Sequence, residues 1–500
     1  MNRTNTPVFT VECKLDLTEL DKVYLEQQMK NYQKLYNTSV KHYKQVLTKL
    51  KTDNRYIETL AKLKATKTDL EKKPYFKELS QLMLEYKLTE SEIQKYMNYQ
   101  RLHAFNSSLG STMVQKQATS LSGAIKKAVF RGTEVHYRKR GYTKSFEGKS
   151  ANTGIIYRKT THTVKVGKKE FKLKPIRKTD TYLKEALTNR VKYSRIVRKP
   201  FKRGYKYFLQ IVLEGTAPKK LILGKGRCGI DEGTSTVAYY NGTEANYEVL
   251  ADGVERYEKE IKRLATKYDR RRRLNNPDCY NENGTIKAGA KFKYTKGCQR
   301  ALFELKNAYR KKGVYVKEQH NKLANHIIEE CDTIIKEPID YRALAKRAKM
   351  TSREDKASVI KTKTGTEKVV KKNKRKKRFG KSINRRSPGL FNKRLEEKVH
   401  QYGGTIINVD LAVYKASQYD HSTRIATKPL LSERTKIVDG RIVQRDLYSS
   451  FLLYCYLTEQ QIDYTLCEKE YETYLKKQEV VVKKIKAIGD KTKNFGIEAF

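Results

Sequence analysis

The stretch LILGKGRCGIDEGTSTVAYYNG, residues 221–242, organises the rest of the chain. Its apolar residues predict a strand that leads to Asp231, a turn at Glu232 and Gly233, and a second strand over the apolar and aromatic residues that follow. The closing Asn-Gly dipeptide is a strong hairpin signal. The stretch therefore predicts a β-hairpin with a carboxylate, Asp231, at the end of a buried strand.

A carboxylate in this position needs a partner. At the end of a buried strand it is poorly solvated, and a divalent metal is the usual partner where the strand end opens into a cleft. Aspartate is also a common cap of a turn. From this stretch alone, Asp231 is either a metal ligand or a turn cap.

The composition predicts a polyanionic partner. The 500 residues carry 108 Lys and Arg against 55 Asp and Glu, a formal net charge of +53. An excess of this size destabilises a compact fold by self-repulsion unless counter-charge arrives, which favours nucleic acid. A solvated cationic surface remains the alternative reading of any single cluster. No apolar window approaches the roughly 18 to 20 residues of a membrane span, so we expect no membrane partner.

The N-terminal half divides into two patterns. Residues 7–15 alternate as a strand, and a capping box at Thr18 opens a long amphipathic helix. Further helices are predicted to about residue 131. Alternating segments then predict a β-rich domain, residues 132–218, which the N-terminal strand could join. The helical segment would then be an insertion between two strands of the same domain.

Two further carboxylates stand in settings like that of Asp231. Glu337 follows a short apolar strand, and Asp446 lies in the first turn of a predicted helix. A pattern of hairpin, helix, strand, insertion, strand and helix can bring all three acids to one sheet edge. Three carboxylates at close range cannot all stay ionised without cations. Two Mg²⁺ ions, about 3.5 to 4 Å apart, would resolve the repulsion and support hydrolysis of a phosphodiester.

Other segments carry more local expectations. The predicted helix from residue 296 to residue 330 could break at Gly313. The polar and strongly charged residues 342–386 predict a basic loop, largely disordered in the absence of nucleic acid. Residues 416–440 carry no regular pattern.

The three acidic segments, GIDEGTSTVAYY, IIKEPIDYRALAKR and VQRDLYSSFLL, resemble the three RuvC motifs of the TnpB family. That family comprises RNA-guided endonucleases encoded by insertion sequences and related to type V CRISPR effectors. LYNTSVKHYKQ, RGYKYFLQIVLEG and LFNKRLEEKVHQYGGTIINVD also have counterparts there, so the resemblance covers most of the chain. It implies that Asp231, Glu337 and Asp446 are the metal-binding catalytic triad of an RNase H-like nuclease.

The resemblance also implies an α/β multidomain architecture, with an RNase H-like RuvC nuclease domain, a β-rich wedge domain and an inserted helical recognition domain. Residues 1–17 would be the N-terminal strand of the wedge domain, 18–131 the recognition domain, 132–218 the rest of the wedge domain, 219–415 the RuvC domain, 416–442 a degenerate zinc ribbon and 443–500 the C-terminal part of RuvC with a helical tail. The implied partners are a guide RNA and double-stranded target DNA with a short flanking motif. We expect a monomer in the cytoplasm of a prokaryotic cell, associated with the nucleoid in use.

The chain departs from the family pattern next to two of the acids. The position after Asp231, usually apolar, is Glu232, which is either a fourth acid near the metals or a solvent-facing turn residue. Pro338 follows Glu337 where another polar residue is usual, and it could shift the strand end.

A third departure concerns zinc. Family members usually carry two CxxC pairs before the third motif, and residues 416–442 contain no cysteine. His421 with Asp420 and Asp439 is not a credible zinc set. No CxxC pair occurs among the seven cysteines of the chain, which also favours a reducing compartment. We therefore expect no structural zinc.

Clusters of basic residues are candidate phosphate contacts without sequence preference. The candidates are Arg270, Arg271, Arg272, Arg273, Lys374, Arg375, Lys376, Lys377 and Arg378. Arg445, beside Asp446, is a candidate contact to the scissile phosphate or the partner in a structural salt bridge.

The predicted function is RNA-guided, Mg²⁺-dependent cleavage of DNA. One alternative is a catalytically silent, RNA-guided DNA-binding repressor derived from TnpB, which intact acids at all three motifs disfavour. A miniature type V CRISPR effector of the same mechanism is another, since the chain is long for TnpB and short for most such effectors. A scaffold that binds RNA through charge alone would need no converged acids.

Overall fold

The computed structural model describes residues 6–66, 68–105, 108–139, 141, 143–346, 353–361, 367–373, 379–430, 432–488, 495–496, 498 and 500. The protein is a mixed α/β protein that divides into two compact units, Met1–Pro218 and Lys219–Phe500. Among the helices described, none is long and apolar enough to cross a membrane.

The first unit combines a seven-stranded sheet with a group of helices. The strand order is β2 (Ser145–Glu147), β6 (Val191–Phe201), β7 (Gly204–Glu214), β1 (Val8–Asp16), β5 (Lys169–Leu173), β4 (Thr163–Val166) and β3 (Ile155–Arg158). The N-terminal strand β1 pairs antiparallel with both β7 and β5, so it lies inside the sheet.

Five helices enter the chain between β1 and β2. They are α1 (Glu19–Lys51), α2 (Asn54–Ala65), α3 (Lys73–Glu85), α4 (Glu90–His103) and α5 (Ser111–Arg131). The predicted capping box opens α1: Thr18 Oγ1 accepts from the backbone N–H of Asp21 at 3.2 Å, and the Asp21 carboxylate accepts from the backbone N–H of Thr18 at 3.1 Å. Helices and sheet share one hydrophobic core, in which Met29 of α1 and Ile196 of β6 are both fully buried. The unit also contains the short helix α6 (Thr181–Ala186).

The second unit is built on a five-stranded sheet. Its order is β10 (Ala245–Val249), β9 (Thr236–Tyr240), β8 (Arg227–Glu232), β11 (Thr333–Lys336) and β14 (Thr405–Asn408). The strands β10, β9 and β8 pair antiparallel, whereas β8, β11 and β14 run parallel. The central strand β8 thus joins the antiparallel half of the sheet to the parallel half.

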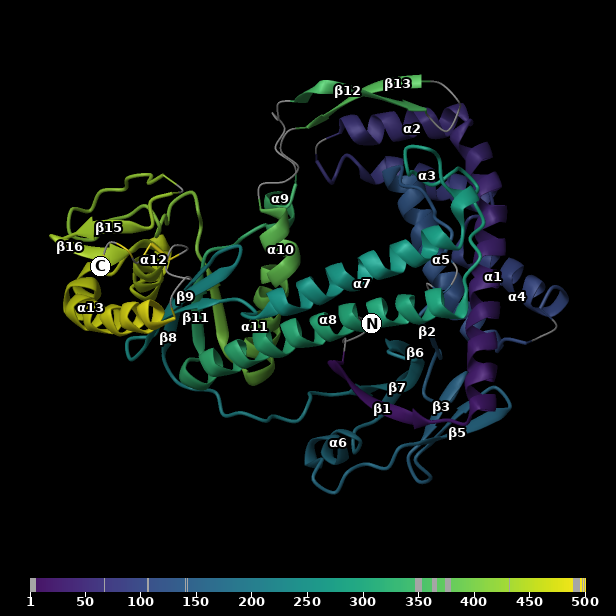
Figure 1. The fold of residues 1–500 in the computed structure, drawn as a ribbon, viewed down its shortest axis with the longest axis horizontal. Coiled ribbons are helices and arrows are strands. Elements are labelled where there is room, and N and C mark those ends of the chain that lie inside the picture. Colours follow the sequence, from purple (N-terminus) through teal and green to yellow (C-terminus); the bar gives the residue numbers. More distant parts are fainter. Residues whose placement is uncertain are drawn as a thin grey trace. The chain divides into compact units, whose positions relative to one another are not determined.

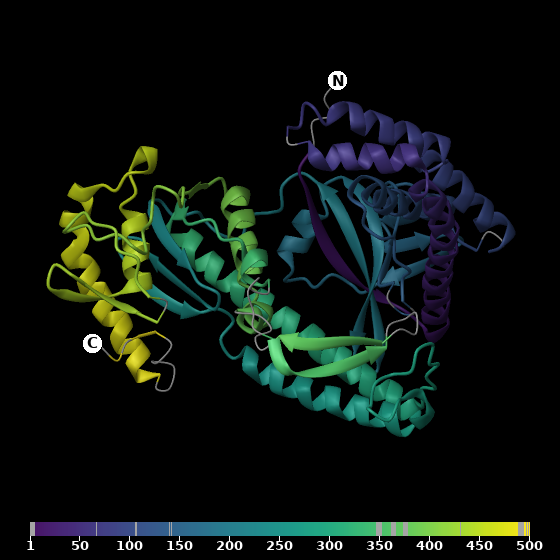
Figure 2. The same ribbon diagram turned by 90° about the horizontal axis from the view of Figure 1, so that it is seen from above.

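Helices cover both faces of this sheet, as Figures 1 and 2 show. On one face, α8 (Lys296–Glu330) and α11 (Pro388–Tyr402) bury apolar residues against Ile230 of β8. On the other, α12 (Arg445–Tyr454) and α13 (Tyr464–Ala487) pack against Tyr240 of β9 through Phe451 and Tyr474. The strand ends therefore lie between two layers of helices.

The expectation that α8 could break at Gly313 is corrected. The helix runs through Gly313 without a break, and α7 (Val254–Leu274) lies alongside it in both views. A single glycine costs a helix only about 1 kcal/mol, which the packing of a long amphipathic helix outweighs.

The expectation of a largely disordered loop at residues 342–386 is wrong for the parts that the structure describes. The strands β12 (Arg353–Lys361) and β13 (Glu367–Asn373) form an antiparallel hairpin with Val359 opposite Val369. The short helix α9 (Tyr341–Leu344) precedes it, and α10 (Gly380–Arg386) follows. β-branched residues on both strands favour the pairing. The expectation of disorder was based on the high charge of the whole segment, which does not reflect these residues.

The segment before α12 is also more regular than expected. The strands β15 (Thr435–Val438) and β16 (Arg441–Gln444) form a tight hairpin. Its turn residues, Asp439 and Gly440, both have positive φ, at 46° and 68°, as a two-residue type I′ turn requires. β16 leads directly into α12, so this hairpin sets where the helix begins.

Candidate active site

Two of the predicted acids lie level with one another at the carboxyl ends of parallel strands. β8 and β11 pair with Ile230 opposite Lys336. Asp231 and Glu337 are the next residue along each strand, so they share one edge of the sheet. Because successive side chains of a strand alternate, both acids belong to the face opposite to Ile230.

The third acid reaches this edge because α12 packs directly on β8. A Cβ atom added at Gly229 would lie 2.1 Å from the carbonyl oxygen of Ser450 and 2.3 Å from the amide nitrogen of Tyr454, so only glycine permits the approach. Since α12 begins at Arg445, Asp446 lies in its first turn. The positive end of the helix dipole favours a carboxylate there.

The three acids line one cavity of about 350 Å³. The turn between β8 and β9 and the segment before α12 supply most of the remaining wall, including the side chains of Lys428 and Arg434. The structure thus brings together Asp231, Glu337 and Asp446 from three separate parts of the chain.

The electrostatics of the cavity disfavour three bare carboxylates. Burial, and then the negative charges of Asp446 and Glu337, raise the pKa of Asp231 well above its usual range. Burial likewise raises the pKa of Glu337. A cation bound among these oxygens would oppose both effects.

Asp446 is held by three side chains. The hydroxyl of Tyr247 donates to its Oδ2 at 2.6 Å, and Nη1 of Arg434 lies 3.6 Å from the same atom. Nε and Nη2 of Arg445 both donate to Oδ1 at 3.2 Å. The Arg445 and Asp446 side chains are only 12% and 15% exposed, so their ion pair is well shielded.

Backbone carbonyl groups also hold the Arg445 side chain. Its Nη1 donates to the carbonyl oxygens of Glu433 at 2.8 Å and Leu430 at 3.3 Å. The structural salt bridge that the sequence left open is therefore present, and Arg445 also lines the cavity. The contact to a scissile phosphate stays a prediction.

The donor set fits a hard divalent cation in its chemistry. Carboxylate oxygens are the ligands that Mg²⁺ prefers, and within the described residues neither Asp231 nor Glu337 forms an ion pair. Across that same part of the chain, however, no three His, Cys, Asp or Glu side chains converge closely enough to hold one ion together. The acids surround the cavity without meeting at a point, and Asp446 is occupied by its arginines.

Glu232 is not a solvent-facing turn residue, and it also lines the cavity of the three acids. It is the last residue of β8, is buried, and lies on the face that packs against α11. The hydroxyl of Tyr341 donates to its Oε2 at 2.9 Å, and Nζ of Lys336 lies 3.8 Å from its Oε1. The turn of the hairpin falls at residues 233–235, one position later than predicted.

Lys336 is a functional candidate that the sequence reading missed. Its side chain is only 1% exposed, and Nζ donates to Glu396 at 2.9 Å and also to Asn392, both on α11. The available signal was a lysine immediately before Glu337 in an otherwise apolar strand. Tyr247 and Arg434, the two distant partners of Asp446, carried no signal at all.

Three of the four clustered arginines at the end of α7 have partners within the protein. Arg272 and Arg273 both pair with Asp269, at 2.6 and 2.8 Å, and Arg271 donates to the carbonyl oxygen of Gly297 at 2.9 Å. Arg270 is exposed. The Arg271 contact joins the end of α7 to the first turn of α8, and nucleic-acid binding by the cluster stays a prediction. Lys374, Arg375, Lys376, Lys377 and Arg378 lie outside the described residues.

His421 belongs to an aromatic cluster. It is buried, its Nδ1 lies 2.7 Å from the hydroxyl of Tyr448, and its ring packs edge-on against Tyr471. Burial lowers the pKa of this histidine. Its contacts are those of a core residue.

Comparisons with known proteins yield only distant structural likenesses. No family model matches the chain, and no curated protein matches it. It is similar to a solved Cas12f1–sgRNA–target DNA complex, with 12% identity over 90% of this chain and 99% of that chain and a TM-score of 0.39. It is also similar to a CRISPR-Cas12f ternary complex, with 11% identity over 89% and 82% and a TM-score of 0.23. Both TM-scores are low, so these likenesses carry no conclusion about the function of this chain.

Proposed function

We propose that the protein is an RNA-guided DNA endonuclease that uses Mg²⁺. One observation carries the nuclease part: Asp231, Glu337 and Asp446, from three separate segments, line a single cavity beside the ends of β8 and β11. Burial raises the pKa of two of these acids, Asp231 and Glu337, and perturbed carboxyl groups at a cavity are typical of a functional site.

The sheet supports an RNase H-like assignment. Three antiparallel strands continue into two parallel ones, and helices cover both faces. The three segments that resemble the RuvC motifs supply the end of β8, the end of β11 and the start of α12. Sequence resemblance and strand order therefore point to the same three residues.

The three acids would act together as metal ligands. Asp231, Glu337 and Asp446 would hold two Mg²⁺ ions. When bound, such ions activate a water molecule and stabilise the leaving oxygen of a phosphodiester. Arg445 fixes the direction of the Asp446 carboxylate through two hydrogen bonds to one oxygen. The buried floor of the cavity keeps bulk water from screening the charges that develop.

The nucleic-acid partners rest on charge and on the sequence resemblance. A net charge of +53 calls for a polyanion. The TnpB-like motifs imply that a guide RNA pairs with the target DNA, so that the protein itself reads only a short flanking sequence. Whether a transposon end or a CRISPR array supplies the guide does not alter this mechanism.

One observation favours a second candidate, a silent RNA-guided DNA-binding protein. The three carboxylates do not converge on one point among the described residues, and Asp446 is already neutralised by Arg445 and Arg434. A repressor descended from a nuclease would tolerate such pairing.

The deciding experiment starts with the protein purified from its native locus and with sequencing of the RNA that accompanies it. DNA matching that RNA is then incubated with the complex and Mg²⁺, with Asp231→Asn as the matched variant. A discrete RNA and cutting that the substitution abolishes would establish the nuclease. Tight binding of matching DNA without cutting, by wild type and variant alike, would establish the silent binder. Absence of any discrete RNA would contradict RNA guidance, on which both candidate functions depend.

A further inference from the structure

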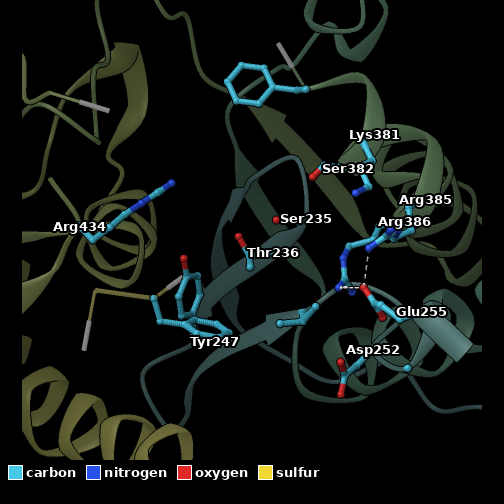
Figure 3. A pocket seen from close by; sticks show the side chains of 14 residues that line it. Ser235, Thr236, Tyr247, Asp252, Glu255, Lys381, Ser382, Arg385, Arg386 and Arg434 are labelled. Atoms are coloured by element: carbon cyan, nitrogen blue, oxygen red, sulfur yellow. Dashed lines mark hydrogen bonds and ion pairs between the residues drawn. The ribbon is translucent and has the colours of Figure 1, made fainter. Parts of the chain in front are cut away.

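A second and larger cavity borders the acids. It has a volume of about 810 Å³ and is lined by the start of β9, by β10, by the turn before α7, by α10 and by Arg434. Figure 3 shows Arg434 on one side, and Lys381, Arg385 and Arg386 on the other. Hydroxyl groups of Ser235, Thr236 and Ser382 lie between them. We call this cavity the basic groove.

Two of its cations have structural partners. Nη1 of Arg385 lies 3.3 Å and Nη2 of Arg386 2.6 Å from Oε1 of Glu255, and Arg386 also donates to the carbonyl oxygen of Leu250 at 2.7 Å. These contacts attach α10 to the start of α7 and to the end of β10. They fix the wall from which Lys381 and Ser382 project.

Lys381 is the cation left over. It is exposed, and it forms no ion pair with any residue that the structure describes. Ser382, the next residue of α10, adds a hydroxyl donor at the same place. A lysine beside a hydroxyl, facing a groove, is suited to one phosphate of a nucleic-acid backbone.

The basic groove is continuous with the acid cavity. Ser235, Thr236, Phe379 and Arg434 line both. A single nucleic-acid strand bound in the basic groove would therefore pass close to the three acids.

Arg434 faces both sites. Its side chain is 39% exposed, and its Nη1 lies 3.6 Å from Oδ2 of Asp446, a long contact for an ion pair. The planar guanidinium group binds phosphate with the same fork geometry that it uses for carboxylate. A phosphate in the groove therefore competes with Asp446 for Arg434, whereas Arg445 stays fixed by its carbonyl contacts.

From this arrangement we propose that the basic groove binds the backbone of the single DNA strand that is to be cut. Lys381 and Ser382 bind one phosphate, and Arg434 transfers from Asp446 to another. The arrival of the strand thus releases Asp446 for the metal, which couples substrate binding to metal binding. This inference rests on the proposed nuclease function and adds to it a strand-binding site and an order of events.

The first test is a lysine footprint that needs no catalysis. Full-length wild type and Asp231→Asn are treated in EDTA with an amine-acylating reagent, with and without a single-stranded DNA oligonucleotide, and labelled lysines are identified by mass spectrometry. The strand should protect Lys381 in both proteins. Lys393 of α11, 70% exposed and outside the groove, is the matched control and should stay labelled. Equal labelling of Lys381 with and without the strand would overturn the site.

The second test measures coupling rather than cleavage. Mn²⁺ affinity is measured by titration calorimetry with and without an oligonucleotide that carries non-cleavable phosphorothioate linkages. In wild type, the strand should tighten metal binding about tenfold, a typical coupling. In Arg434→Gln, the metal should bind tightly without the strand, and the strand should add little. Metal affinity that neither the strand nor the substitution changes would overturn the transfer of Arg434.

The two proposals fail separately. Cleavage of matching DNA without protection of Lys381 would contradict the strand-binding role of the basic groove, and the nuclease proposal would stand. Protection of Lys381 in a protein that does not cut matching DNA would contradict the nuclease proposal, and the strand-binding role of the groove would stand.

Discussion

Lys336 and Glu232 form a buried ion pair behind the candidate active site, with Nζ 3.8 Å from Oε1 and side-chain exposures of 1% and 2%. Each is the chain neighbour of an acid on the opposite face: Glu232 follows Asp231, and Lys336 precedes Glu337. The pair joins β8 to β11 at the level where the two acids emerge. Its position therefore fixes the two strands on which the site is built.

We expect Lys336→Met to destabilise the protein by about 3 to 5 kcal/mol, because it leaves Glu232 buried without its cation. The free energy of unfolding in denaturant measures this. The double variant Lys336→Met, Glu232→Gln should recover much of the loss, since an amide needs no counter-charge. Equal stability of Lys336→Met and wild type would show that the pair contributes nothing.

Gly229→Ala should displace α12 from β8. The added Cβ would meet backbone atoms of Ser450 and Tyr454, which cannot move without the helix. Overpacking of this kind costs about 1 to 3 kcal/mol, and cleavage should fall with it because Asp446 moves away from Asp231.

Gly313→Ala is the matched control for that substitution. Gly313 lies inside α8, and a Cβ there meets nothing within 4 Å. This variant should gain up to about 1 kcal/mol in stability and cut normally. Thermal unfolding of both variants, with cleavage assays on the same samples, separates packing against β8 from the general effect of replacing a glycine. A Gly229→Ala protein as stable and active as Gly313→Ala would contradict the close approach of α12.

Asp231→Asn should stabilise the metal-free protein at neutral pH. The pKa of Asp231 is raised in the folded protein, so the folded state binds the proton more tightly than the unfolded chain does. The free energy of unfolding therefore falls as pH rises from the unfolded pKa towards the folded one. In EDTA the variant should be more stable than wild type at about pH 8, and the difference should shrink near pH 4, close to the ordinary pKa of aspartate. Calorimetry that finds the same difference at both pH values would contradict the raised pKa.

Arg445→Lys should lower the apparent affinity for Mg²⁺ by about 10 to 100-fold, as the loss of a group that orients a metal ligand does. Lysine keeps the charge but cannot bond Asp446 and the two carbonyl oxygens together. The Mg²⁺ dependence of cleavage measures the shift. Arg441→Lys, at an exposed position of β16, is the control and should leave that dependence unchanged. The same dependence in Arg445→Lys as in wild type would remove Arg445 from the site.

Arg270→Ala tests phosphate binding at the end of α7 without disturbing the fold. Arg270 is exposed, whereas Arg272 pairs with Asp269 and lies beside the ring of Phe292. The slope of log affinity against log salt should fall by about 0.7 to 0.9 for Arg270→Ala. Arg272→Ala should mainly lower the melting temperature. An unchanged slope for Arg270→Ala would assign the whole cluster to structure.

Much of the second unit followed from local patterns in the sequence. Asp231 and Glu337 were placed at strand ends because short apolar runs precede them, and Asp446 in a first helical turn because VQRDLYSSFLL opens an amphipathic segment. These patterns involve residues that are adjacent in the chain. The convergence of the three acids at one cavity could be predicted only from the order of the elements and from the family resemblance.

What was missed depends on contacts between distant residues. The Glu232-Gly233 pair predicts a turn, whereas the burial of Glu232 depends on Lys336 and Tyr341, more than a hundred positions away. Arg271 and Arg273, predicted as phosphate contacts, donate to the carbonyl oxygens of Gly297 and Gly284, which lie in a later helix and loop. Charge composition alone does not distinguish a cation that binds a phosphate from one that holds two segments together.

The separation of the three acids along the chain has a consequence for biosynthesis. The parallel half of the sheet cannot form on β8 until β11 and then β14 have been made, and Asp446 follows both on α12. A nascent chain on the ribosome therefore holds no complete cavity until α12 has emerged. Messenger RNA and nearby DNA thus cannot meet the assembled cavity before the segment that carries Asp446 has folded.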